Sequence, residues 1–189
     1  MTRLSFDIET LALDPDDAKG GLHPLTGAII VYSICDEDGP EAYYDGDEVA
    51  LLQRATIALL GRPLYTWNGR GFDLPFLWKR AMVLGVRPTW SLPRNPKPWS
   101  ELCQDTMLLW DSQQRAGGSM DRICRLLGIP GKDGMSGADE WPSVEAGRID
   151  EVAAYCRGDV ERTRAMFKRM TFSASNAAEL HPADTRAAA

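Results

Sequence analysis

The chain has 189 residues, of which 44% are hydrophobic and 25% are charged, and its formal net charge is −6. This length suits one globular domain with a hydrophobic core, and the acidic balance argues against nucleic-acid binding through a broad cationic surface. It does not exclude an enzyme that meets phosphate groups through bound metal ions. There is no apolar stretch of membrane-spanning length and no secretory pattern at the amino terminus, so we expect a cytoplasmic protein without a membrane partner.

The order of apolar patterns along the chain predicts an α/β domain. Four segments have strand character, the second and third joined as a hairpin by DEDGP: Leu4 to Glu9, 27–38, 41–46 and 63–67. Five segments have apolar residues at helical spacing: 46–61, 73–84, 105–113, 119–128 and 149–170. A Gly-rich loop, IPGKDGMSGADEWP, is expected before the final helix. An early hairpin followed by interleaved helices indicates a mixed central sheet.

The domain is expected to span residues 1–172, followed by a C-terminal tail, 173–189, whose composition is typical of disorder. The Pro/Trp-rich connection from Gly85 to Ser100 is too long for a simple linker inside a compact domain, so it is a candidate surface for a protein partner. Four scattered cysteines show no CxxC or Cys/His spacing, which indicates buried, reduced thiols rather than a zinc site. The sequence does not indicate an oligomeric state.

Two acidic residues, Asp7 and Glu9, stand one residue apart in FDIET, at the end of the first predicted strand. Residues at i and i+2 of a strand point to the same face, so these carboxylates should lie side by side and repel each other. Such a pair is tolerated on a solvated edge strand, or is useful where a cation lies between the carboxylates.

A second acidic position occurs in YCRGD on the last predicted helix, where Tyr155 and Asp159 share one face, one turn apart. Taken alone, these would be an ordinary half-buried tyrosine and a surface aspartate. Gly158 costs roughly 1 kcal/mol relative to alanine in a helix interior, so close approach of another backbone or of a ligand would explain it.

A third position follows the strand at 63–67, in TWNGRGFDLPFL. Asp73 could simply be the N-cap of the next helix, yet Asn68, Phe72 and Asp73 together at a strand end are also how a sheet presents ligand-binding groups. Asp105, in LCQDTM, is expected to be a helix N-cap near the same site.

FDIET, WNGRGFD and YCRGD, in this order, resemble the three motifs of the DnaQ-like 3′–5′ exonuclease superfamily, which has a ribonuclease H-like fold. Tyr155, four residues before the last aspartate, is similar to the tyrosine of the DEDDy branch. The stretch from LLGIPGKDG to YCRGD further resembles a standalone predicted polymerase-B-like exonuclease family. The resemblance implies a three-layer domain with a mixed five-stranded sheet, and an enzyme that shortens single-stranded or frayed nucleic acid from its 3′ end. DNA is the expected polymer rather than RNA, but no residue type in the sequence decides how the 2′-hydroxyl is treated.

The resemblance also implies a site. Two divalent cations, Mg²⁺ or Mn²⁺, would be held by Asp7, Glu9, Asp73 and Asp159, while the Tyr155 hydroxyl would orient the attacking water. Without the cations, these acids should repel one another and some of their pKa values should be raised. The substrate would contact Thr10, Leu11, Asn68 and Phe72, although for Leu11 and Phe72 plain core packing is nearly as strong an alternative.

Other functions stay open at this stage. The same fold could serve as a nucleic-acid-binding scaffold with weak or no catalysis, whose mark would be a missing carboxylate, and none is missing. A metal-dependent phosphoesterase acting on small nucleotides would share the metals but ignore the length of the polymer. A purely non-enzymatic interaction module would leave the ordered motif set unexplained.

Overall fold

The computed structural model describes residues 3–17, 19–87, 100–111, 118–132, 134 and 139–173. The strands are β1 (Leu4–Ala12), β2 (Gly27–Cys35), β3 (Pro40–Tyr44), β4 (Leu64–Thr66) and β5 (Cys103–Asp105). The helices are the 3₁₀ helix η1 (Gly20–Leu22), α1 (Glu48–Ala58), α2 (Asp73–Val83), α3 (Thr106–Trp110), α4 (Met120–Leu126), α5 (Glu140–Glu145) and α6 (Ile149–Met170). Most of the segment considered for a protein partner, 88–99, lies outside the described residues, as does 174–189 of the expected tail.

The five strands form one mixed sheet in the order β3-β2-β1-β4-β5. The β1–β2 and β2–β3 pairs are antiparallel, whereas β1–β4 and β4–β5 are parallel. The expected hairpin and mixed sheet are confirmed. β5 was not among the segments with strand character, because three residues are too few to show an alternating pattern. The segment expected as a Gly-rich loop before the last helix ends in a short helix, α5, whose Pro142 lies in the first turn, where proline is tolerated.

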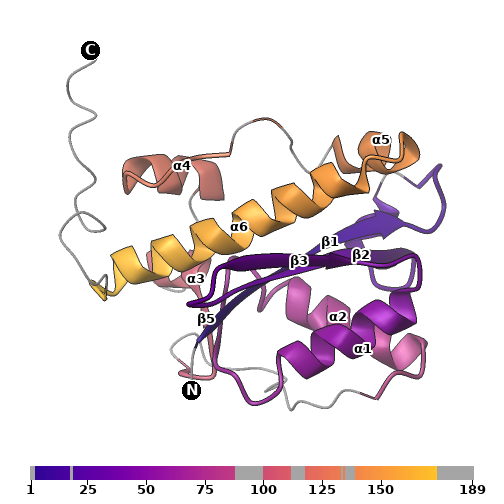
Figure 1. Cartoon of the computed structure of the whole chain (residues 1–189), viewed down its shortest axis with the longest axis horizontal. Helices are drawn as coiled ribbons and strands as arrows, with labels where there is room; N and C mark the ends of the chain where they lie inside the picture. The colour runs from indigo at the N-terminus through magenta and orange to yellow at the C-terminus, as the bar shows by residue number, and fades with distance from the viewer. Residues whose placement is uncertain are drawn as a thin grey trace.

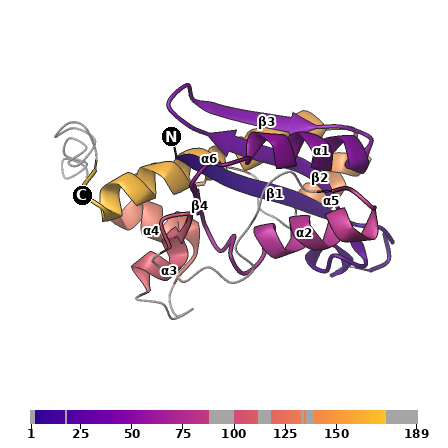
Figure 2. The ribbon, with the colours of Figure 1, turned by 90° about the horizontal axis from the view of Figure 1, so that it is seen from below.

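Helices cover both faces of the sheet, so the domain has three layers (Figure 1, Figure 2). On β1, Leu4, Phe6 and Ile8 belong to one buried cluster with residues of α1 and α2. The intervening Ser5 faces the other side, where its hydroxyl donates to the Val160 carbonyl of α6 at 2.7 Å. Burying a Leu, Ile or Phe side chain stabilises the fold by about 1.5–3 kcal/mol, so this alternation fixes which β1 residues face α6.

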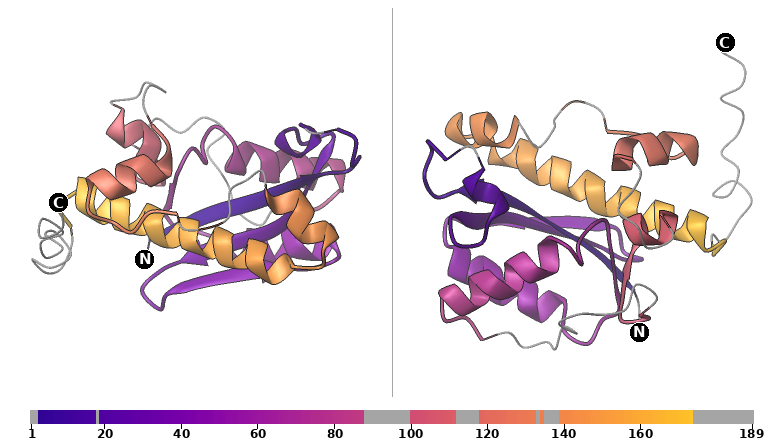
Figure 3. Two further views of the ribbon diagram at one scale, coloured as in Figure 1. Left: turned by 90° about the horizontal axis from the view of Figure 1, so that it is seen from above. Right: turned by 180° about the vertical axis from the view of Figure 1, so that it is seen from behind.

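The long helix α6 crosses the sheet opposite α1 and α2, and α4 lies against its C-terminal half (Figure 1, Figure 3). It spans the residues that the sequence predicts, and its last turn carries Lys168 and Arg169, which complement the helix dipole. Among the described residues, the atoms nearest to a Cβ at Gly158 do not belong to another backbone. A Cβ there would instead lie 2.6 Å from the guanidinium of Arg162, one turn ahead on the same helix.

One cationic side chain of α2 is buried in the core. Arg80 is only 4% exposed. Its guanidinium forms an ion pair with Glu48 at 2.5 Å and donates to the Pro24 carbonyl. Glu48 also accepts the backbone N–H of Ile29, where the β1–β2 register shifts. The ion pair between Glu48 of α1 and Arg80 of α2 therefore joins these two helices to the sheet, beyond the acidic end of β1.

Across the described ranges, no helix combines the length and the apolar character needed to cross a bilayer.

Candidate functional site: a cavity lined by carboxylates

β1 presents two carboxylates to the α6 face of the sheet, as its alternation predicts. Asp7 is half-buried, and Glu9 is 7% exposed. The Cys156 thiol of α6 donates a weak hydrogen bond to Asp7 Oδ2 at 3.6 Å, which places Asp7 beneath this helix. β1 is the central strand of the five, so the pair cannot be explained as carboxylates on a solvated edge strand.

Asp73 joins this pair from the opposite layer. It is not the N-cap of α2, because that position belongs to Phe72, and its buried carboxylate instead accepts the backbone N–H of Ile8 at 3.0 Å. β1 pairs with β4 only as far as Ser5. Beyond that point, the Asp73 carboxylate takes a β1 donor that a longer parallel strand would have satisfied, and this contact brings Asp73 beside Asp7.

The turn between β4 and α2 is held by Asp105. Its carboxylate accepts the backbone N–H groups of Asn68 at 2.9 Å, Arg70 at 3.1 Å and Met107 at 3.1 Å. The bond from Met107 is the N-cap interaction that the sequence predicts for Asp105 at the start of α3. The bonds from Asn68 and Arg70 fix the turn. Asn68 has a φ of 60°, a left-handed conformation that asparagine tolerates better than most residues. A Cβ on Gly69 would lie 2.4 Å from Thr66 Cβ, so glycine is required there.

α6 supplies Asp159, which is 6% exposed and forms ion pairs with two cationic side chains. Lys132 Nζ donates to Asp159 Oδ2 at 2.5 Å, and Arg162 Nη1 donates to Asp159 Oδ1 at 3.1 Å. Lys132 also donates to the Tyr155 hydroxyl at 2.7 Å. The helical spacing of Tyr155 and Asp159 therefore places both within reach of the same ammonium group.

Sequence reasoning did not single out Lys132. The main chain around it is fixed by Arg162, which donates twice to the Gly131 carbonyl, and by Asp121, which accepts the Lys132 N–H at 2.7 Å. A Cβ on Gly131 would lie 2.3 Å from Asp121 Oδ1. The available signal was a single lysine after PG in a glycine-rich stretch, which predicts a tight turn but does not indicate which way the side chain points.

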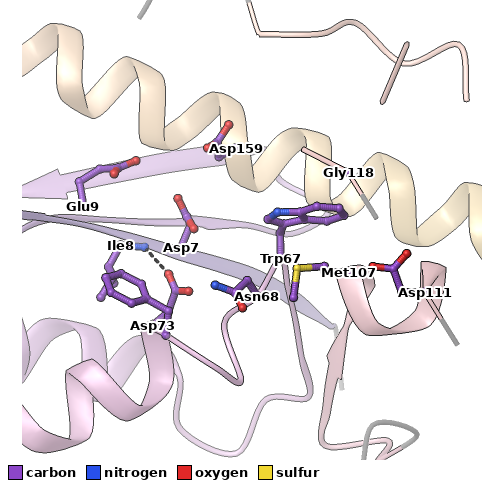
Figure 4. Close-up of a pocket in the computed structure, with 11 residues that line it drawn as sticks. Asp7, Ile8, Glu9, Trp67, Asn68, Asp73, Met107, Asp111, Gly118 and Asp159 are labelled. Carbon is purple, nitrogen blue, oxygen red and sulfur yellow. Dashed lines mark hydrogen bonds between the residues drawn. The ribbon is translucent and has the colours of Figure 1, made fainter. Parts of the chain in front are cut away.

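One cavity of about 480 Å³ brings the candidates together (Figure 4). All four predicted metal ligands line it, together with Asn68 and Phe72, whereas Thr10 and Leu11 are not among the described residues that do. The Thr10 hydroxyl donates instead to the Gly21 carbonyl at 2.6 Å. The cavity also has walls that the sequence analysis did not anticipate: Ile8, Trp67, Met107, Asp111 and Gly118.

The carboxylates perturb one another. Burial raises the pKa of Asp7 well above its usual range, and the neighbouring Asp73 and Asp159 raise it further. Burial also raises the pKa of Asp73 to about 7, although the N–H of Ile8 opposes this shift. The direction agrees with the expectation for clustered acids. Four carboxylates on one cavity are a donor set of hard oxygens, which fits Mg²⁺ or Mn²⁺.

We expect the free energy of unfolding of the metal-free protein to fall as the pH rises from about 4 to about 7. With a pKa of about 7, Asp73 retains a proton in the folded state over a range in which the unfolded chain, with a pKa of about 3.9, has lost it. The folded state binds more protons, so raising the pH costs on the order of 1–3 kcal/mol. Urea unfolding in a chelating buffer at several pH values measures the slope.

Asp73→Asn is the control for this slope, because it removes one of the two carboxyls with a raised pKa and should make the curve less steep, while Asp7 keeps its own contribution. A wild-type curve that coincides with that of Asp73→Asn throughout this range would contradict the expectation. Added Mg²⁺ or Mn²⁺ should raise stability most at the higher pH, where the carboxylates are ionised.

Comparison with known proteins supports the architecture and the family. A family model described as a predicted 3′–5′ exonuclease related to the exonuclease domain of PolB matches residues 44–185, a region that includes Asp73 and Asp159 and begins after Asp7 and Glu9. No curated protein sequence matches the chain. Among solved structures, the family B DNA polymerase of the hyperthermophilic archaeon Pyrobaculum calidifontis is similar, with a TM-score of 0.68 and 17% sequence identity.

That structural match covers 91% of this chain and 24% of the polymerase, so the chain spans about a quarter of the polymerase's length. At this identity the likeness shows the fold alone, and it confirms the ribonuclease H-like fold. The family match, in contrast, covers well over half of the sequence. The chain therefore belongs to the family of predicted 3′–5′ exonucleases related to the exonuclease domain of PolB.

Proposed function

We propose that this protein is a DEDDy-type 3′–5′ exonuclease that releases nucleoside monophosphates from single-stranded or frayed nucleic acid, using two divalent cations. One observation carries the proposal: Asp7, Glu9, Asp73 and Asp159, from three separate elements, line one cavity. Buried like charges destabilise a fold unless something compensates them. Cations bound among the carboxylates would provide that compensation.

The donor set fits Mg²⁺ or Mn²⁺, held by these four carboxylates. When bound, such ions supply a hydroxide near neutral pH and stabilise negative charge on the phosphate and on the leaving oxygen. The chain contributes the positions of the ligands. Asp73 is fixed by the N–H of Ile8, and Asp159 by Lys132 and Arg162.

Tyr155 and Lys132 form the second part of the proposed machinery. Burial raises the pKa of Tyr155 to about 12, so the phenol stays protonated at neutral pH. Lys132 donates to the phenol oxygen, which leaves the Tyr155 proton available for an acceptor on the other side. We assign this O–H to orienting a water or a phosphate oxygen, and the adjacent ammonium to stabilising negative charge there.

The cavity suits a terminal nucleotide rather than a base pair. Its volume of about 480 Å³ falls within the roughly 300–1,000 Å³ typical of small-ligand pockets. Trp67, Phe72 and Met107 provide apolar surface for a base, and Asn68 provides an amide. A paired terminus would first have to open, which favours single-stranded or frayed ends. Thr10 and Leu11 would contact the substrate beyond the cavity, along β1.

The preference for DNA over RNA rests on the family's relation to the PolB exonuclease domain. The test uses DNA and RNA oligonucleotides of one sequence, labelled at the 5′ end, incubated with Mg²⁺ or Mn²⁺. We expect a ladder that shortens from the 3′ end, faster on DNA, and lost in Asp159→Asn. Hydrolysis of a mononucleotide ester without any ladder would show a small-nucleotide phosphoesterase. Binding of the oligonucleotides without hydrolysis would show a scaffold.

Lys132→Met should lower the exonuclease rate by about 10- to 100-fold, the usual range for groups that orient metal ligands. The substitution keeps the length of the side chain but removes the ammonium that joins Tyr155 to Asp159. Lys79→Met, on the exposed face of α2, is the matched control and should be unaffected. Single-turnover rates at saturating metal measure the effect. A Lys132→Met rate equal to wild type would remove this lysine from the machinery.

A further inference from the structure

A thiol lies among the carboxylates that are proposed to hold the cations. Cys156 is fully buried, and its Sγ lies 3.6 Å from Asp7 Oδ2. Asp7, Glu9 and Cys156 each offer one ligand atom, and these three atoms all lie within 4.8 Å of one another. Cys156 and Asp159 are three residues apart on α6, so both lie on the side of the helix that meets the acidic end of β1.

The separation of sulfur and oxygen is the one expected for two ligands of a single cation. With a Zn–S bond of about 2.3 Å, a Zn–O bond of about 2.1 Å and a tetrahedral angle, the two ligand atoms lie about 3.6 Å apart. The observed distance between Cys156 Sγ and Asp7 Oδ2 is also 3.6 Å. Glu9 provides the third ligand atom of the set, and its carboxylate also lines the cavity.

A second group near the sulfur points the same way. Ser33 is opposite Asp7 on β2, is fully buried, and its hydroxyl makes no hydrogen bond of normal geometry within the described part of the chain. This hydroxyl lies close enough to Cys156 to act on the thiol. A metal-bound thiolate would accept a strong hydrogen bond from the Ser33 hydroxyl. Groups that surround a metal site commonly make such hydrogen bonds to the ligands.

We propose that Cys156 is a sulfur ligand for the cation held between Asp7 and Glu9, so that this position binds a borderline-soft ion such as Zn²⁺ or Co²⁺ in preference to Mg²⁺. Mg²⁺ takes oxygen ligands, whereas Zn²⁺ and Co²⁺ accept thiolate. Binding forms a metal–sulfur bond and releases the thiol proton to solvent, with no change of oxidation state. The inference rests on the proposed function, since it concerns the same site, and it makes the two cation positions unequal.

The experiment uses Co²⁺ as the probe, added to the full chain after removal of metals with a chelator. A Co²⁺–thiolate bond gives a charge-transfer absorption in the near ultraviolet, separate from the visible bands that report bound Co²⁺. We expect this absorption in the wild type and its loss in Cys156→Ser. By competition with a coloured chelator, Cys156→Ser should also lose about tenfold or more in Zn²⁺ affinity, with Mg²⁺ affinity nearly unchanged.

Cys124→Ser is the matched control, because Cys124 is equally buried but lies in a separate cluster on α4, and it should keep the near-ultraviolet absorption. Bound Co²⁺ without that absorption in the wild type would overturn the inference, and so would its persistence in Cys156→Ser. If Cys156→Ser fails to fold, Cys156→Ala takes its place, because Cys35, Cys103 and Cys124 are also free thiols and the wild-type band alone does not assign the sulfur. A 3′ ladder with Mg²⁺ in a protein lacking the absorption would refute only the sulfur ligand. The absorption without any ladder would refute only the exonuclease.

Discussion

Replacing Asp7 with asparagine should lower metal-dependent exonuclease activity by about 10³-fold and, at the same time, stabilise the metal-free protein. The loss of activity follows from removing an anionic ligand from the centre of the cavity. The gain in stability, about 1 kcal/mol, follows because burial and the neighbouring Asp73 and Asp159 disfavour the charged form of Asp7. An asparagine oxygen can still accept the Cys156 thiol.

The opposite signs make this test specific. An aspartate with a purely structural role would lose stability on neutralisation, and the activity would follow the amount of folded protein. Urea unfolding with a chelator present and single-turnover hydrolysis with Mn²⁺ measure the two quantities on one preparation. Asp16→Asn, in the exposed loop after β1, is the control and should change neither. A less stable Asp7→Asn protein, or one with residual activity near wild type, would contradict the assigned role.

Much of the sheet could be predicted because its chemistry is local. The alternation on β1 determines which residues face α6, and the apolar spacing of α6 predicted both of its ends, Ile149 and Met170. β5 escaped prediction because three residues carry no periodic signal, and it forms a strand only by pairing with β4. The burial of Arg80 could not be predicted, because its partner Glu48 is 32 residues away.

In the candidate site, too, the residues placed by local spacing could be predicted, and those placed by contacts between distant elements could not. Side-chain direction along a strand or helix depends on spacing, so the pairing of Asp7 with Glu9 and of Tyr155 with Asp159 followed from the sequence. Lys132 and Cys156 depend on contacts between distant elements. The lysine reaches α6 from a loop fixed by Asp121 and Arg162, and the thiol meets β1 across 149 residues of chain. No local pattern encodes such contacts.

Asp105→Ala should destabilise the protein by about 3–5 kcal/mol, far more than the loss of an ordinary helix cap, which costs about 1 kcal/mol. One buried carboxylate accepts three backbone N–H groups, those of Asn68, Arg70 and Met107. Alanine would leave these donors without a partner, and two of them shape the turn that carries Asn68 into the cavity and leads to Asp73. Urea unfolding measures the loss of stability.

Asp47→Ala is the matched control for this substitution. Asp47 is also an N-cap aspartate, on α1, but it is exposed and its side chain accepts only from Val49, at 2.9 Å. Equal losses for the two variants would mean that Asp105 acts as a cap alone. Because the turn positions Asn68 and Asp73, Asp105→Ala should also lose activity at temperatures at which it is still folded, whereas Asp47→Ala should keep its activity. The site would then depend on a carboxylate that lies outside the cavity and holds its wall in place.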